Sequence, residues 1–149
     1  MTKPFLSANI LLPKDTDMTK WSVVACDQYS SEPEYWNRVE DVTNDSPSTY
    51  ELIFPEAFLG EGDELRISKI NSKMQEYMPI FREYPDSLIF LKRTLPTGQT
   101  RLGIVGCVDL EEYDFAKGST SEIRATEGTV LDRIPPRVKI RENASLELP

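Results

Sequence analysis

Two strand-like segments that flank a short turn constrain the fold most strongly. Residues 87–95 and 100–110 are rich in β-branched and aliphatic side chains, and Pro96-Thr97-Gly98-Gln99 lies between them. Apolar runs of this kind, separated by a few turn residues, are typical of an antiparallel β-hairpin. We therefore predict a long hairpin in this part of the chain.

Two helices are predicted before the hairpin. The first runs from Pro33 to Val42, because Ser30 and Ser31 supply an N-cap and a proline suits the first turn. The second begins near Asp63 and presents an apolar face that is expected to pack on a sheet. That face consists of Ile67, Ile70, Met74, Tyr77, Met78 and Phe81. We expect Pro79 to end or kink this helix.

Three further segments are predicted to be extended. Phe5 to Leu12 suits a short strand or an extended arm, Trp21 to Cys26 a buried strand in the middle of a sheet, and Tyr50 to Phe54 a strand closed by Pro55. Strands and helices are mixed without a strict βαβ alternation. The fold class is therefore predicted as α+β, a mixed β-sheet with a long antiparallel hairpin and two main packing helices.

The length and composition favour one folded, cytoplasmic domain. The 149 residues suffice for one sizeable core, so residues 1–149 are expected to form a single domain. Hydrophobic residues make up 39% and charged residues 28%, which is not the profile of a disordered chain. The longest uninterrupted apolar run, residues 88–91, is far too short to span a bilayer. No membrane association is therefore expected.

The charge is unevenly distributed. The chain carries 17 basic and 25 acidic side chains, a net charge of −8, which disfavours general attraction to nucleic acids or anionic membranes. Residues 117–141 are different, with six basic and three acidic side chains. Any anion site is therefore expected to be local and to lie in this segment.

Several kinds of catalytic site are excluded by missing residues. The chain has no histidine, its two cysteines lie 81 positions apart, and its glycine cluster Gly60-Glu61-Gly62 lacks the lysine of a P-loop. A histidine-based triad, the usual zinc signatures and a Walker-type NTPase are thus excluded. Cys26 and Cys107 are predicted to be small core residues rather than nucleophiles. The aromatic residues predicted to line a core or groove are Trp21, Tyr35, Trp36 and Tyr50.

The segment from Arg124 to Arg141 is the strongest candidate for a phosphate site. Thr129 and Asp132 resemble a capping box directly after Gly128, so a short helix is predicted to begin there. The free amides of its first turn, the neighbouring hydroxyls and the positive end of the helix dipole together suit a phosphate.

The arginines of this segment strengthen the prediction. If the segment is helical, one face carries Arg133, Arg137 and Arg141. If it is extended, one face carries Arg137, Lys139 and Arg141. The planar guanidinium matches phosphate oxygens two at a time. The alternative is that these arginines pair with the surplus of carboxylates and cover a surface.

Two carboxylates are candidates for catalysis or metal binding. Asp27 follows a predicted strand and precedes a helix start, so it could bind Mg²⁺ or accept a hydroxyl proton; an Asx-turn or an N-cap is the alternative. Glu127 lies between Arg124 and Arg133 and could be a metal ligand, a general base or a salt-bridge partner. The sequence does not rank these roles.

The chain also resembles the bacterial and archaeal family called domain of unknown function 1015 (DUF1015), from Pro4 to Pro149. The residues that carry the resemblance are Val23-Val-Ala-Cys-Asp-Gln-Tyr29, Glu34-Tyr-Trp36, Arg124-Ala-Thr-Glu-Gly-Thr129 and Asp132-Arg-Ile-Pro-Pro-Arg137. Members are typically longer, so the resemblance implies the N-terminal portion of a larger protein. Some members are described as similar to ParB-like proteins, a group whose relatives include ATP-dependent kinases acting on free serine. A ParB- or sulfiredoxin-like fold is therefore implied.

The resemblance implies ATP and Mg²⁺ as cofactors and a small molecule as substrate. It places Glu127 on the nucleotide side and Asp27 facing it as a magnesium or hydroxyl contact, and both carboxylates are candidates for catalysis and metal binding. With Arg141 added from its spacing, the predicted nucleotide-binding residues are Arg124, Thr126, Thr129, Arg133, Arg137 and Arg141.

The leading functional hypothesis is a kinase that transfers phosphate from ATP to a metabolite hydroxyl, with free serine as the first acceptor. A non-catalytic nucleotide- or anion-binding module is the alternative. DNA binding is the weakest hypothesis, because of the net negative charge. The sequence leaves the oligomeric state open.

Overall fold

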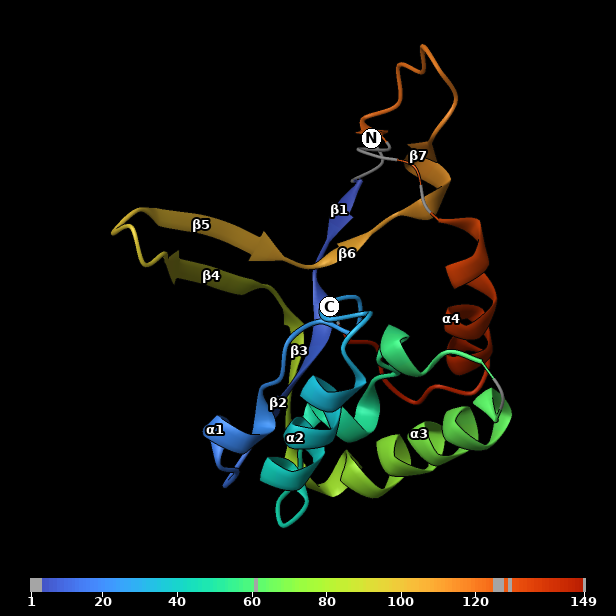
Figure 1. The fold of residues 1–149 in the computed structure, drawn as a ribbon. Coiled ribbons are helices and arrows are strands. Elements are labelled where there is room, and N and C mark those ends of the chain that lie inside the picture. Colours follow the sequence, from blue (N-terminus) through green and yellow to red (C-terminus); the bar gives the residue numbers. More distant parts are fainter. Residues whose placement is uncertain (1–3, 61, 125–127, 129, 149) are drawn as a thin grey trace. The chain divides into compact units, whose positions relative to one another are not determined.

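The structure is a computed structural model, and it describes residues 4–60, 62–124, 128 and 130–148 (Figure 1). These residues divide into two compact units. Unit 1 contains residues 4–12, 82–124 and 128, and unit 2 contains residues 13–60, 62–81 and 130–148. The expected single domain stays a prediction, because a compact unit is not necessarily a part that folds alone.

Unit 2 is helical. Its α-helices are α1 (Met18–Trp21), α2 (Pro33–Thr43), α3 (Asp63–Tyr77) and α4 (Ile134–Arg141). Its 3₁₀ helices are η1 (Thr49–Leu52), η2 (Glu56–Phe58), η3 (Met78–Ile80) and η5 (Leu131–Arg133). Both predicted helices are confirmed as α2 and α3, although the N-cap of α2 is Glu32 rather than a serine. The α-helical part of α3 ends at Tyr77, and Pro79 lies in the 3₁₀ turn that follows.

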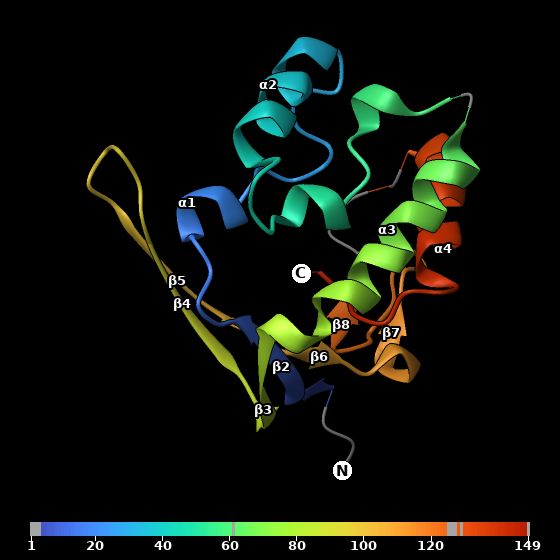
Figure 2. The same cartoon turned by 90° about the horizontal axis from the view of Figure 1, so that it is seen from below.

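The core of unit 2 forms around the predicted apolar face of α3. Ile67, Ile70, Met74 and Tyr77 are buried together with residues from α1 and η1. This face packs against η1 and α4 rather than on a sheet, and Figure 2 shows α3 and α4 side by side. The expectation of a helix lying on a sheet was therefore wrong, because the terminal segment with α4 supplies the apolar partner.

The large aromatic residues predicted for a core are mostly buried. Trp21, Trp36 and Tyr50 lie inside unit 2, whereas Tyr35 is half-buried. The rings of Trp36 and Tyr50 stack with their centroids 6.1 Å apart. Burial raises the pKa of Tyr50 to about 12, and the nearby Glu40 carboxylate adds to this effect. The phenol is therefore neutral at physiological pH.

Two predicted strands are wrong. Helix α1 includes Trp21, and residues 22–25 have no regular structure. Here a side-chain hydroxyl forms the backbone hydrogen bonds that a neighbouring strand would otherwise form. The side chain of Thr49 donates to Trp21 O over 2.7 Å and accepts from Val23 N over 3.3 Å. Residues 49–52 form η1 instead of a strand, since Ser48 caps this turn by accepting from the Tyr50 amide.

Unit 1 contains the strands. They are β1 (Phe5–Leu6), β2 (Ala8–Pro13), β3 (Phe81–Ser87), β4 (Ile89–Thr94), β5 (Thr100–Val105), β6 (Cys107–Val108), β7 (Tyr113–Asp114) and β8 (Ile123–Arg124), with a 3₁₀ turn η4 (Leu110–Glu112). They pair as β1–β6, β2–β3, β4–β5 and β7–β8. The α+β class is confirmed. The single mixed sheet is not observed, because the described strands form four separate two-stranded pairs.

The predicted hairpin is confirmed. Strands β4 and β5 are antiparallel, with Ile89 opposite Val105 and Thr94 opposite Thr100. Gly98 closes the turn at φ 83°, a conformation that glycine adopts without strain. Within the part of the chain that the structure describes, no helix has both the length and the apolar character needed to cross a membrane.

Truncating the α3 face should destabilise unit 2. We expect Ile70→Ala to lower the free energy of unfolding by about 2–5 kcal/mol, because it leaves a cavity in a packed core. Urea titration followed by tryptophan fluorescence measures this, since Trp21 and Trp36 both lie in unit 2. Leu65→Ala on the exposed side of the same helix should change the value by less than about 0.5 kcal/mol. Equal losses for both variants would contradict the assigned core.

Candidate functional site

A cavity of about 270 Å³ lies within unit 2. The loop after α1, the η1–η2 region, α3, η5, α4 and the segment after α4 all contribute to its wall. Its apolar wall includes Leu52, Phe54, Met74, Ile140, Leu146 and Leu148. Its ionisable lining residues are Cys26, Asp27, Glu56, Arg133, Arg137, Arg141 and Glu147. The cavity is thus lined by both apolar and charged side chains.

The central feature of the cavity is a buried carboxylate held by two arginines. The side chain of Glu56 is only 4% exposed. Its Oε2 atom lies 2.5 Å from Nη1 of Arg133, and its Oε1 atom accepts a 2.7 Å hydrogen bond from Nη2 of Arg137. The backbone amide of Glu56 also donates to Cys26 O over 2.8 Å. Glu56 therefore connects α4 and η5 to the loop that carries Asp27.

The two arginines keep unused donors. Their side chains are 40% and 42% exposed, and a guanidinium has more N–H groups than a single contact uses. Arg133 and Arg137 together carry one more charge than Glu56 neutralises. An anion in the cavity can therefore be bound by donors whose positions are already fixed.

Arg141 lines the same cavity but has its own partner. Its Nε donates to Oε2 of Glu147 over 2.9 Å, and its Nη2 contacts the other oxygen of that carboxylate. Both side chains are more than half exposed, so this pair contributes little to stability. The predicted helical face with Arg133, Arg137 and Arg141 is therefore formed, and each of these arginines also has a carboxylate partner.

The predicted cradle of helix amides is not formed by α4. This helix begins at Ile134, and Pro135 and Pro136 occupy its first turn without an N–H to donate. Its N-cap residue, Arg133, makes no side-chain capping bond. Asp132 lies in η5, whereas Thr129, its partner in the predicted capping box, falls outside the described residues. The hydrogen-bond donors that α4 brings to this cavity are therefore arginine side chains rather than helix amides.

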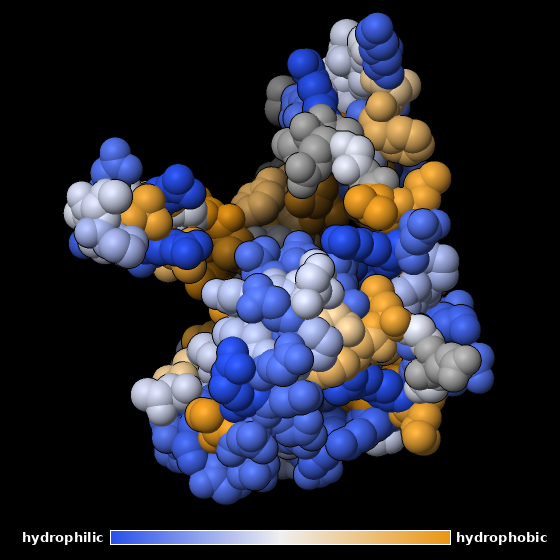
Figure 3. Space-filling model, viewed as in Figure 1, coloured by the Kyte–Doolittle hydropathy of each residue, from blue (hydrophilic) through white to orange (hydrophobic). Residues whose placement is uncertain are grey.

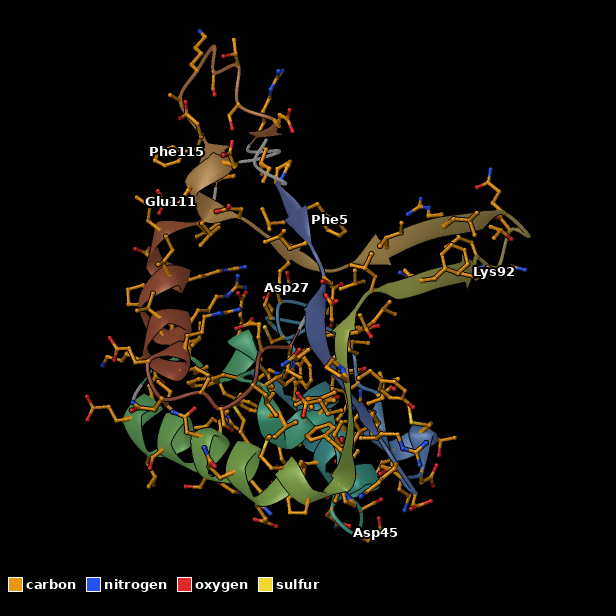
Figure 4. The ribbon with its side chains drawn as sticks, turned by 180° about the vertical axis from the view of Figure 1, so that it is seen from behind. Phe5, Asp27, Asp45, Lys92, Glu111 and Phe115 are labelled. Carbon is orange, nitrogen blue, oxygen red and sulfur yellow. The ribbon has the colours of Figure 1, made fainter. Side chains whose placement is uncertain are left out.

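Asp27 lies on the cavity wall in a turn, not after a strand as predicted. It is exposed, and Nε2 of Gln28 donates to its Oδ1 atom over 3.2 Å. Figure 4 shows Asp27 on the loop that faces α4. It does not cap α2, whose N-cap residue is Glu32. The carboxylate is therefore available to a ligand in the cavity.

The cysteines differ in environment. Cys26 is half-buried at the cavity, and burial raises the pKa of its thiol despite the opposing effect of Arg137. Cys107 lies on β6 and is exposed, so the expectation of a core position was wrong for it. Strand β6 has only two residues, Cys107 and Val108, and both are exposed.

The remaining predicted residues lie elsewhere. Arg124 belongs to unit 1, where it ends β8 and donates from Nε to Ser121 O over 2.9 Å. Thr126, Glu127 and Thr129 fall outside the described residues. The structure therefore brings Asp27, Arg133, Arg137 and Arg141 to one cavity.

Sequence analysis missed Glu56. This residue follows Pro55 and the apolar run before it, so it is the first charged group after a segment predicted to be a strand. That position gives a weak signal that the carboxylate is buried. It does not indicate the partner, because Arg137 is 81 residues away.

A magnesium ion would have limited protein ligands here. No cluster of three histidine, cysteine, aspartate or glutamate side chains suited to a metal occurs among residues 4–60, 62–124, 128 and 130–148. Mg²⁺ is often bound by one or two carboxylates together with substrate phosphates and water. Asp27 fits that mode, whereas Glu56 is already engaged by two arginines.

Removing the buried carboxylate should destabilise the packing of α4 in unit 2. We expect Glu56→Ala to lower the free energy of unfolding by about 1–3 kcal/mol, because both arginines lose a desolvated partner. Glu64→Ala is the matched control, since Glu64 also pairs with an α4 residue, Lys139, but is almost fully exposed. Its effect should stay below about 0.5 kcal/mol. Similar losses in urea titrations of both variants would contradict the central role of Glu56.

A comparison with protein-family models gives a match over almost the whole chain. The model described as "Protein of unknown function (DUF1015)" matches residues 7–149, so the chain belongs to the DUF1015 family. Searches of curated proteins and of solved structures found no match. The family resemblance drawn from the sequence is confirmed, and its ParB-like part stays a prediction.

Proposed function

We propose that the cavity of unit 2 binds a phosphate-bearing small molecule and serves phosphoryl transfer from ATP to a metabolite hydroxyl. The observation that carries the proposal is the pair Arg133 and Arg137, fixed on the buried Glu56 carboxylate at the cavity wall. Free serine is the first acceptor to test. A ParB-like fold, implied by the sequence resemblance, belongs to the same proposal.

The fixed arginines favour anion binding for an entropic reason. A free arginine loses rotamer freedom when it binds a ligand, which costs about 0.5–1.5 kcal/mol per side chain. Here the ion pairs with Glu56 have already ordered both guanidinium groups. Charge-assisted bonds from guanidinium to phosphate are among the strongest hydrogen bonds in proteins. The site is thus preorganised for a phosphate group.

The size and lining of the cavity limit the kinds of ligand that it can bind. Its volume of about 270 Å³ lies just below the usual range for ligand pockets, about 300–1,000 Å³. This suits a small metabolite or the phosphate end of a nucleotide. Apolar residues such as Phe54 and Ile140 can pack against the organic part of the ligand. Asp27 lines the same cavity and would contact a hydroxyl group of the ligand.

Phosphoryl transfer makes modest demands on the protein. The reaction depends on positioning and on stabilising charge over the transferred oxygens, which arginines provide. Asp27 would orient the attacking hydroxyl or hold Mg²⁺ together with the phosphates, and Mg²⁺ would neutralise charge on the leaving group. The part assigned to Glu127 stays a prediction, since this residue falls outside the described residues.

A non-catalytic anion-binding module is the second candidate. It is favoured by the carboxylates of the cavity, because Glu56 and Glu147 are both paired with arginines, which leaves Asp27 as the one unpaired carboxylate among the described lining residues. Such a module would bind the same phosphate-bearing ligand without turnover. Binding and transfer must therefore be measured separately.

Ligand binding should protect Cys26 from alkylation. This thiol lines the cavity, and Cys107 can be replaced by serine to leave a single reporter. In the Cys107→Ser background, we expect ATP or inorganic phosphate to slow the reaction of Cys26 with a maleimide, followed by mass spectrometry. An unchanged rate at saturating concentrations of both anions would contradict binding in this cavity.

Arg133→Ala tests whether the guanidinium group of this residue binds the ligand. We expect about 10- to 100-fold weaker protection by ATP, because a hydrogen bond to a charged group contributes about 1.5–3 kcal/mol. Lys139→Ala is the matched control, since it removes a cation from α4, the helix that Arg133 precedes as the N-cap residue, but not from the cavity lining. Equal affinities for the two variants would assign Arg133 a purely structural role.

Transfer should be detected directly. We expect the chain, incubated with labelled ATP, Mg²⁺ and serine, to form phosphoserine, and Asp27→Asn to reduce the rate at least about 100-fold if this group orients the hydroxyl. A panel of other hydroxylated metabolites extends the assay. Binding with no product across the panel would favour the non-catalytic module.

A further inference from the structure

The hairpin of β4 and β5 presents an uncovered apolar face. The register places Phe90 opposite Ile104 and Lys92 opposite Leu102, and these four side chains point to the same side of the hairpin. The side chains of Phe90, Leu102 and Ile104 are 67%, 66% and 61% exposed. Figure 3 shows hydrophobic and hydrophilic residues interleaved on the projecting hairpin.

Such a hairpin needs a covering partner. A two-stranded sheet is only marginally stable in water unless a hydrophobic face packs against something else. A contiguous exposed apolar patch also marks an interaction surface more often than a free one. Phe90 and Ile104 form the centre of this patch, so the partner should carry exposed apolar side chains of its own.

The charge of the hairpin indicates what kind of partner fits. Residues 88–106 contain Lys92, Arg93 and Arg101 and no carboxylate, although the chain as a whole has a net charge of −8. None of these cations takes part in an ion pair among residues 4–60, 62–124, 128 and 130–148. The complementary surface should therefore be acidic as well as apolar.

Unit 1 contains a surface of this kind in its other projecting part. Residues 109–115 read Asp-Leu-Glu-Glu-Tyr-Asp-Phe, with four carboxylates and no cation. The side chains of Leu110 and Phe115 are 76% and 79% exposed. The amide of Ala116 donates to Asp114, which lowers the pKa of that carboxyl and keeps it charged. These carboxylates also form no ion pair within the described chain.

The two surfaces do not meet within one copy. Figure 4 shows Lys92 on the hairpin and Glu111 and Phe115 on a separate projection, on the other side of β1. Both projections belong to unit 1. A second copy of the chain therefore offers the hairpin the acidic, apolar surface that it lacks.

We propose that the chain forms a reciprocal dimer in which the β4–β5 hairpin of each copy docks on residues 109–115 of the other. Two such contacts are related by a two-fold axis, so the interface closes and does not propagate into a filament. Phe90 and Ile104 pack against Leu110 and Phe115, and Lys92, the cation on the same face of the hairpin, meets the carboxylates. This proposal is independent of the proposed function, because neither surface belongs to the cavity.

The first test is the mass of the whole chain in solution. Light scattering coupled to size exclusion should give twice 17.0 kDa at concentrations of about 10–100 µM. Phe90→Glu should give the monomer mass, whereas Leu65→Glu, an equally exposed leucine position on α3, should leave the dimer intact. A monomer for the unaltered chain, or a dimer that survives Phe90→Glu, overturns the proposal.

A charge exchange tests whether the acidic segment is the partner. Lys92→Glu and Glu111→Lys should each weaken self-association, since like charges then face each other in both contacts. Mixing the two variants should restore a dimer that contains one copy of each, because both contacts then pair opposite charges. Circular dichroism confirms that each variant is folded. If the mixture associates no better than either variant alone, residues 109–115 are not the docking surface.

Discussion

The buried Glu56 carboxylate is the constraint on which the cavity of unit 2 depends. A charge that is 4% exposed is costly to keep in a protein interior unless it is paired, and here both of its oxygens are paired with arginines. Those arginines come from a segment about 80 residues later, so the pair also joins the terminal helix to the rest of the unit. The same two ion pairs therefore also fix the positions of Arg133 and Arg137 at the cavity.

The sequence predicted the elements whose signals are local. The hairpin and α3 were predicted because a glycine turn and a regular apolar spacing act over short distances. The segments 21–26 and 50–54 were wrongly predicted as strands because a short apolar run indicates burial without indicating conformation. The conformation of both segments depends on the hydroxyls of Ser48 and Thr49, which form hydrogen bonds with backbone groups that a neighbouring strand would otherwise bind.

The candidate site was predictable in part for the same reason. The four-residue spacing of Arg133, Arg137 and Arg141 indicated a shared helical face, and this face lines the cavity. The helix amides predicted as phosphate donors were those directly after Gly128, and this part stays a prediction because Thr129 falls outside the described residues; the later helix α4 has Pro135 and Pro136 in its first turn, which cannot donate. Glu56 could not be assigned, because pairing across such a separation depends on the tertiary fold and leaves no periodic pattern.

The chain uses its cations in two physically different ways. In unit 2, the arginines of the cavity are paired internally, and the carboxylate at their centre is shielded from solvent. In unit 1, the basic hairpin and the acidic residues 109–115 are exposed and have no ion-pair partners among the described residues. Salt screens exposed charges over about 8–10 Å at physiological ionic strength, but acts much less on buried pairs. Rising ionic strength therefore weakens attraction between the unit 1 surfaces before it disturbs the arginine geometry of the cavity.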